Sequence, residues 1–290
     1  MITGDPILPP ELERDIFELV VSIDTDFTTD YRSHQHVGDT VLVLPRVCRR
    51  VQSWIEPLIY ERVTLLLNSR LGGRDPFTAL LSTVDARPAT FFAAHVKHLY
   101  LDRTVPLSTV TRILSVCTGI VSFGCHHPYT DVALLLSSLP LRRLLVAELS
   151  FPDLSPLPPW ASSLTHLGLS SVIPTSASTI LAQFPSLTHL AVDSSKLPYG
   201  VKLGPVVTAL FAAVPHVRFL VLLTGSRPHY SWVMHLLRAY GLVDQRVHVH
   251  QPPRGGDTPW HAWSWRVPDC FAVAELQLRQ RQGTAIQRKA

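Results

Sequence analysis

The residues best suited to chemistry are Cys125, His126 and His127, with Cys117 eight positions upstream. Thiolate and imidazole are common zinc ligands in proteins. The C-x7-C-H-H spacing does not match a recurrent zinc motif, however, and Cys125 falls where an inward-pointing side chain is expected. We therefore interpret Cys125 as a core residue and expect neither a metal site nor a cofactor.

Other catalytic motifs are absent from the sequence or lack their structural context. The glycine pairs at 72–73 and 255–256 do not have the spacing of a phosphate-binding loop. The chain contains neither G-x-S-x-G nor H-E-x-x-H. Trp260, Trp263 and Trp265 could form a ligand platform, but we favour a role in closing the apolar end of the core. We expect a protein that is not an enzyme.

The composition is typical of a folded domain. Of 290 residues, 46% are hydrophobic and 17% are charged, which supplies an ordinary buried core and too little charge for a disordered chain. The net charge is +4 and no run of five or six like charges occurs, so nucleic-acid binding is not indicated. No apolar stretch approaches the ~18 residues of a membrane span. We expect a cytoplasmic or nuclear protein with reduced, buried cysteines.

The elements that position these residues follow a repeat. The pentapeptide SLTHL occurs at 163–167 and again at 186–190. An L-x-x-L-x-L pattern extends this doublet in both directions, at steps of 24, 21, 23, 23 and 30 residues. Its middle positions are Leu99, Phe123, Leu144, Leu167, Leu190 and Leu220. The pattern predicts short strands that form one parallel sheet in sequence order, with these residues stacked inside.

The segments between the predicted strands have helical spacing, notably at 107–116, 131–139, 176–184 and 205–214. Residues 151–163 lack room for a helix, and we expect an irregular loop there. An α/β sheet built from the same elements without a true repeat is the alternative.

The pattern is similar to the leucine-rich repeat family, whose period is about 20–29 residues. The resemblance implies an α/β solenoid with a parallel sheet over residues 64–267. The family's asparagine position here holds Thr104, Pro128, Leu149, Val172, Ser195 and Gly225. We therefore expect an irregular, curved form of the solenoid.

The N-terminal region predicts helices. Pro9 and Pro10 suit a helix start. One apolar row of this helix consists of Leu12, Ile16, Leu19, Val20 and Ile23, and a second consists of Phe17 and Val21. Apolar residues from 44 to 58 have helical spacing, with joints expected at Pro45 and Pro57. Such helices could simply cap the solenoid.

The same region resembles the F-box over residues 7–63. The matching residues are Leu8, Pro9, Glu11, Leu12, Ile16, Val47, Cys48, Arg49, Arg50 and Tyr60. The chain departs from the family at Val51, where tryptophan is usual, and in the polar segment 24–39, which we expect to be a loop. The resemblance implies an F-box-like domain at 1–63 that binds a Skp-type adaptor, and through it a cullin, with Leu8, Pro9, Leu12, Ile16 and Val47.

The pattern also predicts which residues line the open face of the sheet. We expect a protein target to contact His98, Tyr100, Arg143, His166, His189 and Phe219. The expected face holds one arginine and two aspartates, too few cations for a phosphate backbone. If His166 and His189 are both exposed, target binding should depend on pH between 5 and 7. The alternative is that the chain's own termini cover part of this face.

The C-terminal segment 268–290 predicts a short helix followed by a basic tail. Together these features favour a non-catalytic substrate receptor of a cullin-type (SCF) ubiquitin ligase. The alternative is a repeat scaffold that binds a protein with no ligase attached.

Overall fold

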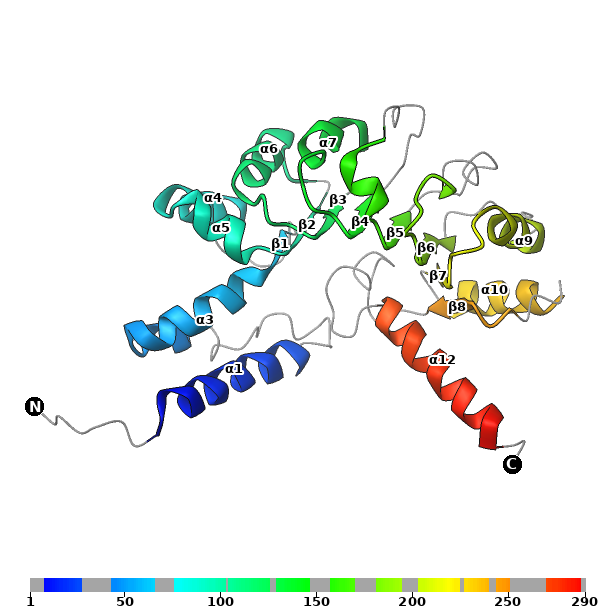
Figure 1. Ribbon diagram of the computed structural model, residues 1–290, viewed down its shortest axis with the longest axis horizontal. Helices are drawn as coiled ribbons and strands as arrows, with labels where there is room; N and C mark the ends of the chain where they lie inside the picture. The colour runs from blue at the N-terminus through cyan, green and yellow to red at the C-terminus, as the bar shows by residue number, and fades with distance from the viewer. Residues whose placement is uncertain are drawn as a thin grey trace, which may run out of the picture. The chain divides into compact units, whose positions relative to one another are not determined.

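The structure is a computed structural model that describes residues 8–27, 43–65, 76–102, 104–125, 129–146, 157–169, 181–194, 203–224, 227–239, 244–250 and 270–287. The chain divides into two compact units, Met1–Val63 and Thr64–Ala290. Figure 1 shows their helices and strands in the colours of the chain order.

The first unit consists of α1 (Pro10–Phe27), the 3-10 turn η2 (Leu44–Arg46) and α3 (Arg49–Glu61). The helix start predicted from the two prolines is confirmed, and two glutamates in the first turn of α1 favour the positive helix end. The buried core contains Val21, Leu44, Val51 and Ile55. An ion pair between Arg50 and Glu13 also links α3 to α1.

Two expectations for this unit were wrong in detail. The loop expected at 24–39 begins later, because α1 continues to Phe27; residues 28–39 lie outside the described residues. Pro57 does not form a joint but lies inside α3. A proline there removes one backbone hydrogen-bond donor, and packing of Ile55, Leu58 and Ile59 into the core supports the helix on both sides of it.

The second unit is built on an eight-stranded sheet whose order is β1-β2-β3-β4-β5-β6-β7-β8. The strands are β1 (Arg62–Leu65), β2 (His98–Leu101), β3 (Ser122–Cys125), β4 (Arg143–Val146), β5 (His166–Leu169), β6 (His189–Asp193), β7 (Phe219–Leu223) and β8 (Val247–His250). All pairings from β2 to β8 are parallel. Strands β1 and β8 extend the six predicted strands at either end.

The predicted register is confirmed. Leu99 pairs with Phe123, and the row continues through Leu144, Leu167, Leu190 and Leu220. Each of these residues is at most 2% exposed. Parallel strands lie ~4.8 Å apart, so one apolar side chain per strand forms a continuous buried row.

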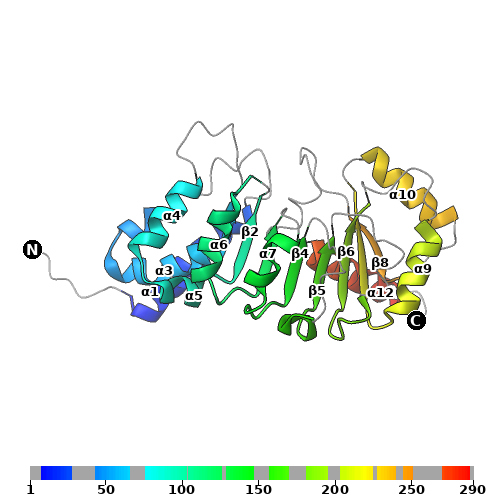
Figure 2. The ribbon, with the colours of Figure 1, turned by 90° about the horizontal axis from the view of Figure 1, so that it is seen from above.

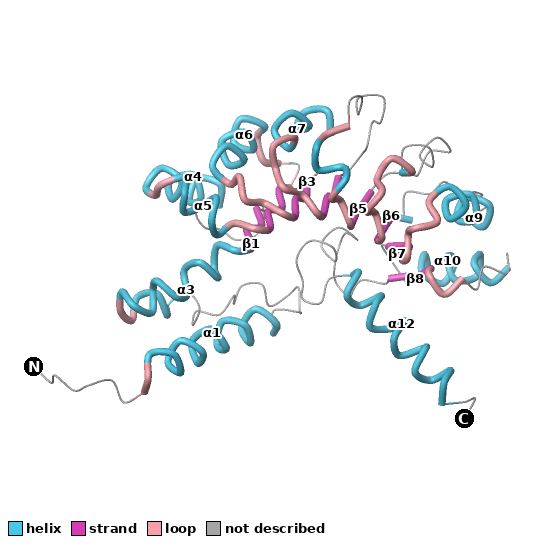
Figure 3. The backbone as a smooth tube through the Cα atoms, viewed as in Figure 1, coloured by secondary structure: helices cyan, strands magenta, loops and turns pink. Residues whose placement is uncertain are grey.

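Helices connect the strands (Figure 3). They are α4 (Pro76–Ala86), α5 (Ala89–His95), α6 (Leu107–Val116), α7 (Tyr129–Leu136), α9 (Leu203–Ala213) and α10 (Arg227–Ala239). The helices predicted at 107–116, 131–139 and 205–214 are therefore present as α6, α7 and α9. The helix predicted at 176–184 lies largely outside the described residues. Within the loop expected at 151–163, Pro159–Ser162 forms the 3-10 turn η4.

The two faces of the sheet are covered differently. Helices α6, α7 and α9 lie on one side, whereas α12 (Cys270–Gln287) begins against the other (Figures 1 and 2). Helix α12 packs against β7 and β8. It is longer than predicted, because residues 283–287 continue the helix where a tail was expected. None of the described helices combines the length and apolar content that crossing a membrane requires.

The buried row predicts the cost of removing one of its members. Leu167→Ala should lower the free energy of unfolding by about 2–5 kcal/mol, because it leaves a cavity between Leu144 and Leu190. Urea denaturation of the two proteins measures this difference.

The matched control is Leu134→Ala in α7, where the leucine is 87% exposed. This variant should change the free energy of unfolding by no more than about 0.5 kcal/mol. Equal effects of the two substitutions would contradict the packing described for Leu167.

Candidate functional site

The first candidate surface is an apolar stripe made of Leu12, Ile16 and Leu19 of α1 and of Leu8, which lies two residues before the helix begins. These four side chains are between 43% and 58% exposed. The core of the unit contains Phe17 and Val21 of the second apolar row, and also Val20, which the sequence placed in the same row as the stripe. The stripe and the second row lie on different sides of one helix because each follows a spacing of three or four residues. The stripe is therefore not part of the core of its own unit.

The five residues predicted to bind an adaptor are all exposed. Leu8, Pro9, Leu12 and Ile16 lie at the start and along the stripe of α1, and Val47 lies in the turn between η2 and α3. Val47 is 59% exposed. Several large apolar side chains exposed on one small unit usually mark a partner site.

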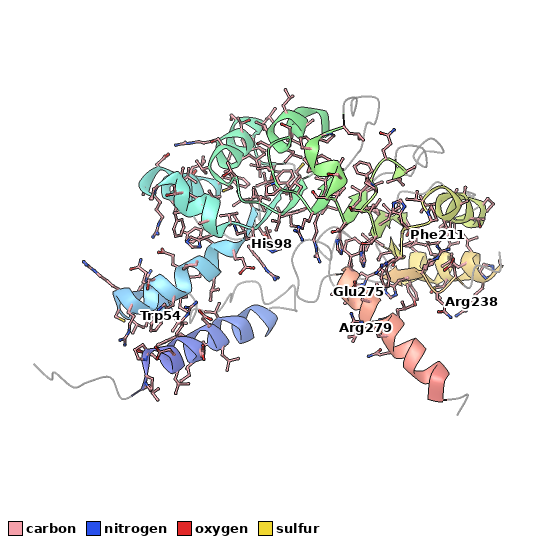
Figure 4. All side chains as sticks on the ribbon, in the orientation of Figure 1. Trp54, His98, Phe211, Arg238, Glu275 and Arg279 are labelled. Atoms are coloured by element: carbon pink, nitrogen blue, oxygen red, sulfur yellow. The ribbon has the colours of Figure 1, made fainter. Side chains whose placement is uncertain are left out.

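The second candidate surface is a row of first residues on successive strands. His98 pairs with Ser122, and the row continues through Arg143, His166, His189 and Phe219. We call this the polar-aromatic row. The predicted alignment of the expected target-binding residues is confirmed by this register, with Tyr100 two positions further along β2. Figure 4 labels His98 near one end of the row and Glu275 of α12 near the other.

Tyr100 has no exposed surface, so it cannot contribute to an accessible face in this structure. Its ring fills the space left by Gly124 on the next strand, where a Cβ atom would lie 2.8 Å from the ring. Tyr100 also belongs to a buried cluster that contains Leu145 and the α12 residues Phe271 and Ala274. Burial accounts for the upward shift in the pKa of the Tyr100 hydroxyl.

The condition that His166 and His189 are both exposed, on which the pH dependence of target binding rested, is not met. His189 is buried and His166 is half-buried. Their rings stack with centroids 4.1 Å apart, and Phe219 stacks on His189 at 4.7 Å. Phe271 meets His166 and His189 edge to face, at 4.9 and 5.6 Å. The chain's own C-terminal helix thus covers this part of the face.

Hydrogen bonds fix the orientation of each histidine ring. The Thr165 hydroxyl lies 3.0 Å from the Arg142 carbonyl oxygen, and the Thr188 hydroxyl lies 3.2 Å from the Thr165 carbonyl oxygen. Each hydroxyl also lies 2.8 Å from the Nδ1 atom of the histidine that follows it.

His189 also contacts α12. Its Nε2 atom lies 2.9 Å from Oε1 of Glu275 on α12. An ionised carboxylate only accepts hydrogen bonds, so Nε2 of His189 carries a proton and donates to it. The other carboxylate oxygen of Glu275 lies 3.5 Å from Arg279 on the same helix.

His166 is neutral. Burial is the largest cause, and together with the electrostatic influence of His189 and Arg143 it lowers the pKa of His166 to about 2. Within the stacked pair, His189 donates the hydrogen bond to α12, and His166 supplies an uncharged ring. The pH dependence of target binding that assumed two exposed histidines has no basis in this geometry.

Among the described residues, the remaining sequence candidates do not form a metal centre. No group of three or more His, Cys, Asp or Glu suited to a metal occurs there. Cys117 and Cys125 are buried, and burial raises the pKa of the Cys117 thiol to about 12. Cys48 is exposed, although the cysteines were expected to be buried. His126, His127 and Trp260, Trp263 and Trp265 lie outside the described residues.

Comparison with known proteins yields no significant match: no family model, no curated protein and no solved structure matches this chain.

The neutral state of the half-buried His166 predicts how acid affects stability. The pKa of His166 is lower in the folded protein than its ordinary value of 6.5. Between these values the unfolded chain binds a proton that the folded protein does not bind, so stability is lost as the pH falls below about 6.5. A His166→Phe variant keeps a ring in the stack but cannot bind this proton.

The wild type should therefore lose about 1.4 kcal/mol more free energy of unfolding than the variant between pH 7.5 and pH 5.5. Urea denaturation of both proteins at the two pH values measures this difference. An equal loss in the two proteins would show that His166 takes up a proton while folded.

Proposed function

We propose that this protein is a non-catalytic substrate receptor of a cullin-type (SCF) ubiquitin ligase. In this proposal the first unit is an F-box-like domain that binds a Skp-type adaptor through Leu8, Pro9, Leu12, Ile16 and Val47. The second unit, an irregular leucine-rich-repeat-like solenoid, holds a protein target. The observation that carries the proposal is the exposed apolar stripe of α1, beside a core built from the helix's other row.

The energetics of this surface support a protein partner. Full burial of one large aliphatic side chain is worth roughly 1.5–3 kcal/mol. The stripe offers several half-exposed side chains of this kind, so a partner groove that covers them gains a substantial apolar contribution. The F-box resemblance suggests the identity of the partner, since its matching residues include Leu8, Leu12 and Ile16 of the stripe.

A receptor of this kind contributes proximity instead of chemistry. It brings a target lysine near a ubiquitin-charged enzyme, which raises the effective concentration of the two reacting groups. A chain whose role is confined to binding needs no catalytic residues of its own. The proposed place of action is the cytoplasm or the nucleus.

A scaffold without a ligase is the second candidate, and Val51 favours it. The F-box family usually has tryptophan at this position, whereas Val51 is fully buried in the core with Ile55. A buried valine adds nothing to the surface that an adaptor would contact. In both proposals the second unit binds a protein target. They differ only in whether the first unit binds a Skp-type adaptor.

Capture of a purified Skp-type adaptor tests the receptor. Leu12→Ala combined with Ile16→Ala should weaken adaptor binding by at least about 30-fold, or roughly 2 kcal/mol, because both side chains leave the proposed interface. Thermal unfolding should be unchanged, since both side chains are exposed in the unbound chain. Isothermal titration calorimetry and a thermal melt provide the two measurements.

The matched control is Arg14→Ala combined with Glu18→Ala, which removes the exposed salt bridge on another side of α1. This variant should bind the adaptor as the wild type does. Failure of the wild type to bind any Skp-type adaptor would exclude the receptor and leave the scaffold. Equal loss in both variants would mean that the stripe is not the interface.

A further inference from the structure

The apolar stripe of α1 is bordered on one side by acidic side chains. Asp15 lies three residues after Leu12 and four residues before Leu19, so these three residues are neighbours on the surface of the helix. Glu11 lies four residues before Asp15 and extends the same border. Glu11 and Asp15 are both exposed. This border of the stripe therefore carries two exposed carboxylates about one helical turn apart.

Glu11 and Asp15 differ from two other carboxylates of α1. Glu13 forms an ion pair with α3, and Glu18 forms an ion pair within α1. No ion pair joins Glu11 or Asp15 to another described residue. Glu11 lies in the first turn, where the positive end of the helix favours a carboxylate. Asp15 lies beyond that turn, so the helix end does not account for a carboxylate at this position.

The spacing of the stripe fits a helix as the partner element. Leu12, Ile16 and Leu19 follow one another at intervals of four and three residues. These alternating intervals are the pattern by which one helix packs its apolar side chains between those of another. In such packing, the residues that border the apolar row face the partner helix, and their charges determine which partner binds. Asp15, immediately before Ile16, holds a bordering position of this kind.

The charge of the whole first unit has the same sign as this border. Residues 1–63 contain 11 aspartates and glutamates against 6 arginines, a formal charge of −5, whereas the whole chain carries +4. Arg46 and Arg49, on either side of Val47, are exposed but do not reverse the sign. A negative field favours association with a cationic partner. Two copies of this unit repel each other by the same rule.

We propose that Glu11 and Asp15 select the partner of the first unit: an amphipathic helix that lies along the stripe and places lysine or arginine side chains against these two carboxylates. The inference rests on the proposed function in that this partner is the Skp-type adaptor, and it names the charge that the adaptor's helix carries. The stripe supplies the apolar contact. The carboxylates distinguish a cationic helix from an acidic helix of the same apolar content.

The two carboxylates act by discrimination between partners. At the border of an interface, an opposite charge on the partner adds modest affinity and raises the association rate. A like charge at the same position opposes binding. The difference in affinity between a cationic and an acidic helix therefore exceeds the gain from the attractive pairs alone. Because salt screens exposed charges, this difference should shrink as the ionic strength rises.

Two synthetic helical peptides test the selection without any unknown partner. Each has about three heptads with leucine in the apolar row, and the bordering positions hold lysine in one peptide and glutamate in the other. Fluorescence anisotropy of the labelled peptides measures their affinity for the full-length chain at low ionic strength. The wild type should bind the lysine peptide at least about tenfold more tightly than the glutamate peptide. Glu11→Lys combined with Asp15→Lys should reverse this preference.

Two control variants separate selection at the stripe from a general effect of charge. Glu56→Lys combined with Glu61→Lys makes the same change in net charge on α3 and should keep the wild-type preference. Leu12→Ala combined with Ile16→Ala should weaken binding of the lysine peptide at least about tenfold, because the apolar contact is lost.

A neutral variant serves if the reversed variant does not unfold cooperatively in a thermal melt. Glu11→Gln combined with Asp15→Asn keeps the shapes of both side chains and removes their charges. This variant should bind the two peptides with affinities within about threefold of each other.

The inference is overturned if the wild type binds neither peptide, binds the two equally, or prefers the glutamate peptide. The last result would assign the selection to Arg46 and Arg49. A preference that survives the reversal of Glu11 and Asp15 also overturns it. So does a wild type that sediments as a dimer through the stripe, because a second copy would then be the partner.

The peptide measurement contains no adaptor, so its outcome can be distinguished from that of the receptor test. Adaptor capture without a peptide preference would leave the receptor and exclude selection by the two carboxylates. A peptide preference without adaptor capture would exclude the receptor and leave a cationic helix of another protein as the partner.

Discussion

In-register parallel pairing of the strands is the constraint on which the second unit depends. Each strand from β3 to β7 places its first residue beside the first residue of its neighbours, and its second beside their second. Adjacent strands are ~4.8 Å apart, so side chains at equivalent positions touch. The same pairing stacks Leu167 on Leu190 in the buried row and His166 on His189 on the opposite face.

This constraint explains the repeated pentapeptide. The serine of each copy donates to a carbonyl of the preceding strand segment, from Ser163 to Leu141 and from Ser186 to Ser162. The threonine hydroxyl of each copy contacts a carbonyl that lies just before the preceding strand, from Thr165 to Arg142 and from Thr188 to Thr165. The same hydroxyl contacts Nδ1 of the histidine that follows it. The leucines are buried. Each residue of SLTHL therefore makes a defined local contact. The same contacts are made at two adjacent strands, and this explains why the same residues occur twice.

The rows of side chains along the sheet could be predicted from the sequence because they are periodic. The packing of α12 over one face of the sheet could not be predicted. The hydrogen bond between His189 and Glu275 joins residues 86 positions apart, and Glu275 lies in no repeat. Tyr100 was placed correctly on its strand but expected at an accessible surface, because its burial depends on Gly124 and on α12 together. The only sequence signal for this contact was a phenylalanine, an alanine and a glutamate on one face of the predicted C-terminal helix.

The first unit shows a related limit. Two apolar rows on α1 were evident from spacing, but spacing alone does not determine which row faces the core. Packing against Val51 and Ile55 of α3 selects the row of Phe17 and Val21. The adaptor-binding residues Leu12 and Ile16 were chosen from a family pattern, and their exposure depends on that selection. Pro57 inside α3 illustrates the same point, since tertiary packing outweighs the local preference of proline for a helix end.

In the contact between α12 and the sheet, different interactions determine how strongly the helix packs and where it lies. Burial of Phe271 contributes roughly 1.5–3 kcal/mol and requires only an apolar surface, so other positions on an apolar floor could also accept it. The hydrogen bond from His189 to Glu275 contributes less net energy, because both groups give up hydrogen bonds to water when it forms. Its geometry, however, allows one carboxylate position relative to one ring. The aromatic cluster therefore holds the helix against the sheet, and the hydrogen bond determines where along the row it lies.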